Sequence, residues 1–263
     1  MHHSHMNIVI ALIAYALASI FSLLGFTEQK ASNVFRKIGN ALFTFATFLI
    51  TLVTIQSYNQ AAYMVTSSLT LTTAISWITL FIHIVFKLNG GIILASPIAT
   101  LVILIEMFQN RGGHFEMSPP PLLLNIHITT AIIGEAFAIA SFIWAIMDLY
   151  QKNAMKKKKI NLLLQNSMNL GSTEKALNLC LWVGFIFLTI GLLLGAIANQ
   201  FSSLSETNVA GEKILWAIGV WICYLSALIV HYTRGANSKR TAQITVFGFI
   251  IMSLGLFGLT SWR

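Results

Sequence analysis

The sequence predicts an all-α integral membrane protein with eight transmembrane helices. Hydrophobic residues make up 56% of the 263 residues, only 9% are charged, and the mean hydropathy is +0.77. A soluble domain carries roughly 25% charged residues, so a soluble fold is excluded. The same composition excludes disorder, which requires low hydrophobicity and high charge. Two cysteines are too few for a disulfide framework or a cysteine-rich metal site.

Apolar runs long enough to cross a membrane recur along the whole chain. A helical span needs about 20 apolar residues to cross ~30 Å of hydrocarbon. The alternating pattern of membrane β-strands is absent, so each run is expected to be a helix. In chain order, the predicted spans are Asn7–Phe26, Ile38–Tyr58, Leu69–Lys87, Gly91–Phe108, Leu122–Tyr150, Leu179–Asn199, Ile214–Tyr232 and Thr241–Leu259.

A proline-rich segment divides the predicted spans into two groups of four. Pro119, Pro120 and Pro121 are expected to stiffen an external connector. We therefore expect an N-terminal membrane half, residues 1–121, and a C-terminal half, residues 122–263. The fifth span is longer than one crossing needs, so it is expected to tilt or to project into the cytoplasm.

The basic residues predict the orientation of the chain. Cytoplasmic loops carry an excess of Lys and Arg, and 13 of the 16 such residues fall in one set of alternate loops. Both termini then face the periplasm. This asymmetry accounts for the net charge of +8 without a nucleic-acid partner, and membrane lipid is the expected contact of the basic loops. The 13 residues are Lys30, Arg36, Lys37, Lys87, Lys152, Lys156, Lys157, Lys158, Lys159, Lys175, Arg234, Lys239 and Arg240.

Three histidines in or beside the spans are candidate ligands, because ionisable groups are costly in lipid and mark functional sites. His127 begins the fifth span near the outer surface. At a rise of 1.5 Å per residue, His83 and His231 lie roughly 20 and 25 Å from the outer edge. His83 could therefore pair with His231 within the membrane, whereas His127 could pair with the external His114 or act alone. A simpler role as an interfacial anchor or packing residue stays open for each.

Two acidic residues of the fifth span are expected to differ in role. Glu135 follows His127 by about two helical turns, so both can face one cavity. Glu135 could orient a histidine, relay a proton, or pack against a neighbouring hydroxyl group. Asp148 lies further along, close to the headgroups, and is expected to form a salt bridge with a lysine.

The remaining motifs indicate packing rather than catalysis. Gly191 and Gly195 form a small-xxx-small pair, which usually marks close helix packing. Trp182 and Trp216 fit an interfacial aromatic belt. A nucleophile–base set, a phosphate-binding loop and an HExxH motif are not visible in the sequence, so no enzyme is predicted.

Four stretches of the second half resemble a known family. They are Leu124–His127, Leu188–Ala196, Gly211–Trp221 with Tyr224, and His231–Gly235 with Lys239 and Arg240. These stretches resemble the cytochrome c assembly family, which includes CcsA-like and CcmC-like haem-handling proteins. The size and layout are most similar to its YpjD/HemX-type members. The resemblance covers about Leu122–Arg263, and the first half matches only in span count and hydropathy.

The resemblance implies a multi-pass protein of the bacterial inner membrane that binds or handles haem b. It implies partners among the proteins of cytochrome c assembly or haem biosynthesis. By position, His127 matches the external histidine of the family and His231 an intramembrane one, and His83 is the candidate for the other. Glu135 would then tune a ligand. The Trp-rich segment of the family has no counterpart in residues 199–213.

Two other functions stay open at this point. A non-haem assembly or regulatory scaffold would predict that the histidines are dispensable. A proton-coupled transporter of small solutes would use Glu135 and His127, and would predict inverted repeats around a midplane cavity. Such a repeat is not apparent in the sequence.

Overall fold

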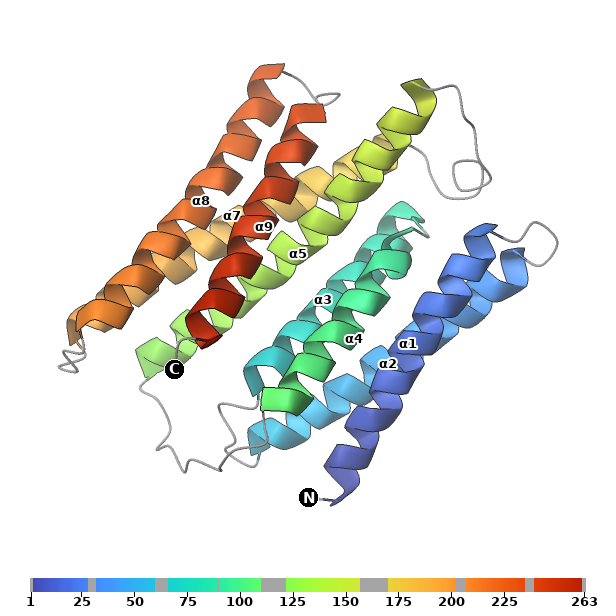
Figure 1. Ribbon diagram of the computed structural model, residues 1–263, viewed down its shortest axis with the longest axis horizontal. Helices are drawn as coiled ribbons and strands as arrows, with labels where there is room; N and C mark the ends of the chain where they lie inside the picture. The colour runs from blue at the N-terminus through green and yellow to red at the C-terminus, as the bar shows by residue number, and fades with distance from the viewer. Residues whose placement is uncertain are drawn as a thin grey trace. The chain divides into compact units, whose positions relative to one another are not determined.

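The computed structural model describes residues 2–27, 32–59, 66–88, 90–109, 122–156, 170–201, 207–234 and 239–261. Within these ranges the chain forms α-helices and no strand, which confirms the all-helical fold class (Figure 1). The helices are α1 (His2–Thr27), α2 (Ser32–Asn59), α3 (Thr66–Phe86), α4 (Gly91–Gln109), α5 (Leu122–Lys156), α7 (Leu170–Phe201), α8 (Thr207–Arg234) and α9 (Lys239–Ser261).

Six of the described helices are long and apolar enough to cross a membrane, namely α1, α2, α3, α5, α7 and α8. α4 is apolar over the shorter stretch Gly91–Ile105, and α9 is not among the six. Large apolar side chains face outward, such as Phe48 at 58% and Ile84 at 72% exposed. Such surfaces suit lipid rather than water. The chain is therefore a multi-pass membrane protein, and the full set of eight spans stays a prediction.

The chain forms two compact units. The first contains α1 to α4, and the second contains α5 up to Lys152, α7 from Glu174 onward, α8 and α9. The three connector prolines lie outside the described residues. The division into domains at residue 121 stays a prediction.

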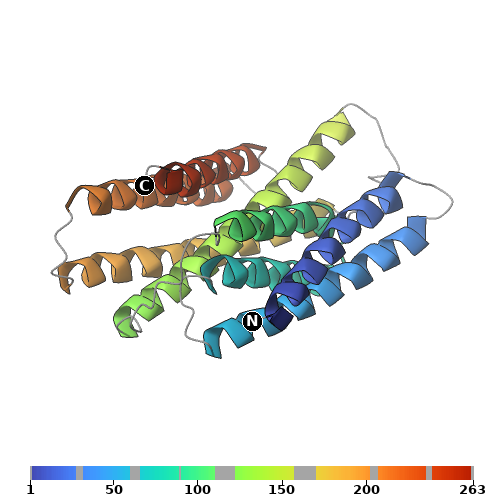
Figure 2. The same ribbon diagram turned by 60° about the horizontal axis from the view of Figure 1, so that its bottom comes forward.

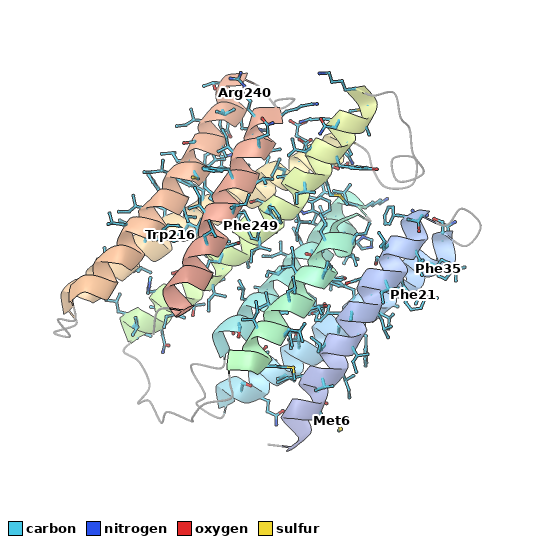
Figure 3. The ribbon with its side chains drawn as sticks, viewed as in Figure 1. Met6, Phe21, Phe35, Trp216, Arg240 and Phe249 are labelled. Carbon is cyan, nitrogen blue, oxygen red and sulfur yellow. The ribbon has the colours of Figure 1, made fainter. Side chains whose placement is uncertain are left out.

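Close helix contacts build the first unit. A Cβ added at Gly39 of α2 would lie 2.6 Å from the Ser22 hydroxyl oxygen of α1 and 3.0 Å from the Ser22 backbone nitrogen, so a larger residue there would crowd α1. Further along the same pair, the rings of Phe21 and Phe35 have centroids 6.1 Å apart (Figure 3). Small residues let helix backbones approach in membranes, where the hydrophobic effect does not drive association.

A buried tyrosine ties three helices of the first unit together. The Tyr15 hydroxyl of α1 shares a 2.8 Å hydrogen bond with the Ser76 hydroxyl of α3 and donates to Thr47 Oγ1 of α2 at 3.4 Å. Its ring meets Phe43 edge-on, with centroids 5.4 Å apart. All four side chains are fully buried, so lipid cannot replace these polar contacts.

Tyr15→Phe is expected to destabilise the first unit by roughly 1–3 kcal/mol, because it leaves buried hydroxyl groups short of a partner. Thermal unfolding of the full chain in detergent measures the effect. Ser19→Ala is the control, since among the described residues the Ser19 hydroxyl bonds only the Tyr15 carbonyl of its own helix. An unchanged midpoint in Tyr15→Phe would show that the network adds no stability.

The second unit is built around α5. α8 and α9 lie side by side in both views (Figures 1 and 2). The Tyr224 hydroxyl of α8 donates to the Ala138 carbonyl of α5 at 3.1 Å. Phe142 of α5 stacks on Phe249 of α9, with ring centroids 3.9 Å apart. These contacts join α8 and α9 to the middle of α5.

The helices that contain the predicted fifth and sixth spans are longer than those spans on the side where they approach each other in the chain. α5 continues past the predicted end at Tyr150 to Lys156, and α7 begins at Leu170 rather than at Leu179. Hydropathy marks the apolar part of a helix, whereas polar residues such as Gln, Lys and Glu also favour helix and extend it into the headgroup region.

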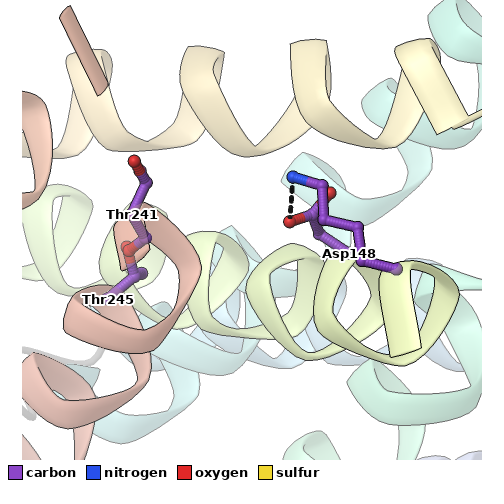
Figure 4. A network of polar contacts seen from close by, with 4 residues as sticks. Asp148, Thr241 and Thr245 are labelled. Carbon is purple, nitrogen blue, oxygen red and sulfur yellow. Dashed lines mark hydrogen bonds and ion pairs between the residues drawn. The ribbon is translucent and has the colours of Figure 1, made fainter. Parts of the chain in front are cut away.

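One ion pair is buried near the C-terminal end of α5 (Figure 4). Lys152 Nζ lies 2.8 Å from Asp148 Oδ2, and the side chains are 7% and 1% exposed. The prediction that Asp148 pairs with a lysine is therefore confirmed. Figure 4 shows this pair together with Thr241 and Thr245 of α9, which are buried as well.

Candidate functional site

One close helix contact of the second unit is an antiparallel seam between α5 and α7. Its residues on α5 are His127, Ala131, Gly134 and Ala138, which face Gly195, Gly191, Leu188 and Gly184 on α7. A Cβ at Gly134 would lie 2.9 Å from the Leu188 backbone nitrogen, and one at Gly191 would lie 3.4 Å from the Ala131 backbone. The prediction that Gly191 and Gly195 mark close helix packing is confirmed.

His127 lies at one end of this seam, with its ring against α7. Its Nδ1 is 2.8 Å from the Gly191 carbonyl oxygen. Because a carbonyl only accepts, Nδ1 carries a proton, and in the neutral ring Nε2 is then the nitrogen with the lone pair. A Cβ at Gly195 would lie 2.6 Å from the His127 Cε1 atom, so the ring occupies space that glycine leaves open.

This state of the His127 ring suits an iron ligand. Metal-ligating histidines usually donate their other ring N–H to a carbonyl or carboxylate, as Nδ1 does here. Among the described residues, no group of three or more His, Cys, Asp or Glu could hold a bare metal ion. One protein ligand is enough for a cofactor that brings its other iron ligands with it, as haem does.

His83 has both ring nitrogens engaged. Nδ1 donates to the Leu88 carbonyl at 2.9 Å, and the Asn40 amide nitrogen lies 3.4 Å from Nε2. Lys87, which lies between His83 and Leu88 in the chain, has a backbone φ of 53°, in the left-handed region. His83 therefore closes the turn from α3 to α4, and ligation through Nε2 would require Asn40 to move.

His231 lies on α8 of the second unit and is partly buried. Its ring meets Tyr232 at 89°, and no hydrogen bond from the described residues reaches it. The Tyr232 hydroxyl accepts from Trp182 Nε1 at 2.9 Å, which places His231 level with Trp182 on α7. Trp182 precedes Gly195, the neighbour of His127, by 13 residues, or about 20 Å of helix. His127 and His231 are therefore too far apart to ligate one iron.

Glu135 is partly buried on α5, directly after Gly134 of the seam. Within the described ranges no group pairs with its carboxyl group. Eight residues separate it from His127, about 12 Å along the helix. The Gly191 carbonyl, rather than Glu135, accepts the ring proton of His127. His114, the predicted external partner of His127, lies outside the described residues.

The predicted intramembrane pair of His83 and His231 stays a prediction, because the two residues lie in different units. Sequence reasoning missed the Gly191 carbonyl as the partner of His127. Its only signal was the spacing of Gly191 and Gly195, which indicated helix packing without identifying what packs there. It also missed a hydrogen bond between α7 and α8, where Trp221 Nε1 donates to Thr189 Oγ1 at 2.8 Å.

The family comparison covers nearly the whole chain. The family described as Cytochrome C assembly protein matches residues 5–263. The chain belongs to the cytochrome c assembly protein family. This confirms the resemblance of the second half and extends it to α1–α4, which resemble the family in sequence as well as in hydropathy.

Relatives within the cytochrome c assembly family share modest identity with the chain. Inner membrane protein YpjD of Escherichia coli (strain K12) is 25% identical over 64% of this chain and 61% of YpjD. Protein HemX of Bacillus subtilis (strain 168) is 23% identical over 95% of this chain and 92% of HemX. Cytochrome c biogenesis protein CcsA of Solanum lycopersicum is 25% identical over 70% of each protein. The match thus spans about three fifths of YpjD. No solved structure matches the chain.

Proposed function

We propose that this member of the cytochrome c assembly family is a non-catalytic protein of the bacterial inner membrane that binds or handles haem b. The observation that carries the proposal is the state of His127, whose Nδ1 donates to the Gly191 carbonyl. Its Nε2 meets no hydrogen-bond partner in the part of the chain that the structure describes. The similarity to a cytochrome c biogenesis protein supports it.

The three histidines have separate roles in this proposal. His127 would hold haem iron through Nε2. His231 and His83 are candidates for a second, inner site, and Glu135 would be a polar neighbour that tunes a ligand. When bound, haem supplies redox-active iron, whereas the protein supplies ligation, orientation and an apolar environment. Proteins of cytochrome c assembly or haem biosynthesis are the proposed partners.

The proposal also includes the topology. α4 and α9 join the six apolar helices to make eight spans, and both termini lie on the periplasmic side. The excess of Lys and Arg in one set of loops supports this orientation. His127 then lies near the periplasmic surface, and His83 and His231 lie near the cytoplasmic one.

Absorption spectra of the purified protein in detergent, as isolated and after addition of hemin, test the proposal. Histidine-ligated haem b gives a sharp Soret band, and α and β bands on reduction. His127→Ala is expected to lose the part of this spectrum that arises from the outer site. His231→Ala and His83→Ala together are expected to lose any signal from the inner site.

Thr129→Ala is the matched control. Thr129 lies two residues from His127, and within the described ranges its hydroxyl bonds only the Asn125 carbonyl of its own helix. It is expected to keep the wild-type spectrum. A protein that takes up no haem even with added hemin would contradict the proposal and favour a non-haem scaffold. A wild-type spectrum in all three histidine variants would contradict the assigned ligands.

A further inference from the structure

The contact between His127 and α7 has a feature that ordinary helix packing does not require. Gly195 and Gly191 lie one helical turn apart, and the imidazole of His127 uses both. Gly195 provides space, because its missing Cβ would be 2.6 Å from Cε1, 3.1 Å from Nδ1 and 3.3 Å from Nε2 of the ring. Gly191 provides the carbonyl that accepts from Nδ1 at 2.8 Å.

We infer that Gly195 is a positioning residue, which selects the Nδ1–H tautomer of His127 and so makes Nε2 the coordinating atom. This inference rests on the proposed function for its haem-binding part. The hydrogen bond made by one ring nitrogen determines which nitrogen is left to bind a metal. In the pose that donates to the Gly191 carbonyl, the ring occupies the space that the missing Cβ of Gly195 leaves open.

The other glycines of the seam lack this relation to a polar group. A Cβ at Gly184 would meet the Phe137 Cβ atom at 3.2 Å, and one at Gly134 would meet Leu188. Gly184 therefore serves only close packing. A Gly184→Ala variant adds a methyl group to the same helix pair, 3.2 Å from the Phe137 Cβ atom, and does not touch the His127 ring, which makes it the control for Gly195→Ala.

The first test needs no haem. Nitrogen-15 NMR of ¹⁵N-histidine-labelled, haem-free protein in detergent distinguishes a protonated ring nitrogen from an unprotonated one, and His127→Gln identifies the His127 signals. The wild-type protein and Gly184→Ala are expected to show His127 with a protonated Nδ1 and an unprotonated Nε2. Gly195→Ala is expected to lose this pattern, because the added methyl displaces the ring from the Gly191 carbonyl.

The second test is hemin titration of the same three proteins, followed by absorption. Loss of a group that orients a ligand typically weakens metal binding about 10–100-fold, so we expect a loss of this size at the His127 site in Gly195→Ala. Gly184→Ala is expected to bind as the wild type does.

The outcomes separate this inference from the proposed function. An unchanged His127 tautomer in Gly195→Ala, or the same tautomer change in Gly184→Ala, overturns the positioning role. Wild-type haem binding by Gly195→Ala, when His127→Ala has lost it, also overturns that role and leaves the proposed function intact. A tautomer change without haem binding by any of the proteins supports the positioning of the ring and contradicts the proposed function.

Discussion

Lys152→Met is expected to destabilise the second unit by about 3–5 kcal/mol, which is typical of a buried ion pair that loses one partner. Asp148 is 1% exposed, and its Oδ2 pairs with Lys152. Its Oδ1 has no hydrogen-bond partner among the described residues, so little else compensates the carboxylate. Lys239 interacts with the Asp148 charge more weakly than Lys152 does.

A buried thiol in the same unit can report this effect. Cys180 of α7 is fully buried, so a thiol reagent reaches it only when the second unit opens. In a Cys223→Ala background, the modification rate of Lys152→Met is expected to rise at least about a hundredfold, since 1.4 kcal/mol corresponds to a factor of about ten. Lys156→Met is the control, because Lys156 is exposed one turn further along α5.

A double variant separates the loss of charge pairing from the loss of packing. Asp148→Asn with Lys152→Met removes both charges and is expected to recover most of the stability. If the double variant opens as readily as Lys152→Met, the unpaired carboxylate is not the cause. A wild-type rate in Lys152→Met itself would show that the ion pair adds no stability.

Gly134→Leu is expected to force α5 away from α7 and to destabilise the second unit by about 1–3 kcal/mol or more through overpacking. Even a Cβ at Gly134 would lie 2.9 Å from the Leu188 backbone nitrogen, and a backbone atom cannot move aside as the tip of a side chain can. Because His127 lies in the same seam, the affinity of the His127 site for haem is expected to fall as well. The Cys180 assay and the hemin titration measure the two effects.

Gly219→Leu is the matched control for this variant. Apart from its own helix backbone, a Cβ at Gly219 of α8 would meet no atom of the described residues within 4 Å, so the same substitution meets open space there. Its Cys180 modification rate is expected to stay near the wild-type value. If Cys180 were modified equally fast in Gly134→Leu and Gly219→Leu, the close contact at Gly134 would not be the cause. The destabilisation would then come from replacing a glycine within a helix.

The helices illustrate how far sequence reasoning reaches. The apolar runs predicted each described helix, because crossing ~30 Å of lipid requires about 20 apolar residues whatever the neighbours are. The ends of α5 and α7 were misjudged, since polar residues near the headgroups continue a helix without an apolar signal. Asp148 was correctly expected to pair with a lysine, but its partner Lys152 had been assigned to a loop.

At the candidate site, too, the sequence predicted some features and only the structure showed others. The residues of the site could be selected from the sequence, because a histidine or carboxylate in lipid is costly and therefore informative. The hydrogen-bonding state of each side chain could not be predicted from the sequence. The role of each ring depends on the carbonyl that its Nδ1 meets, which is that of Leu88 for His83 and that of Gly191 for His127.

The sequence by itself therefore determined the class of the protein, its helices and its candidate ligands, since these follow from hydropathy and charge along the chain. Only the tertiary structure decided that His127 rests on Gly195 and donates to Gly191. The physical reason is that every residue has the same backbone carbonyl. Whether the His127 ring can reach the Gly191 carbonyl depends on the missing Cβ of Gly195. Both glycines lie on a helix more than sixty residues away from His127 in the chain.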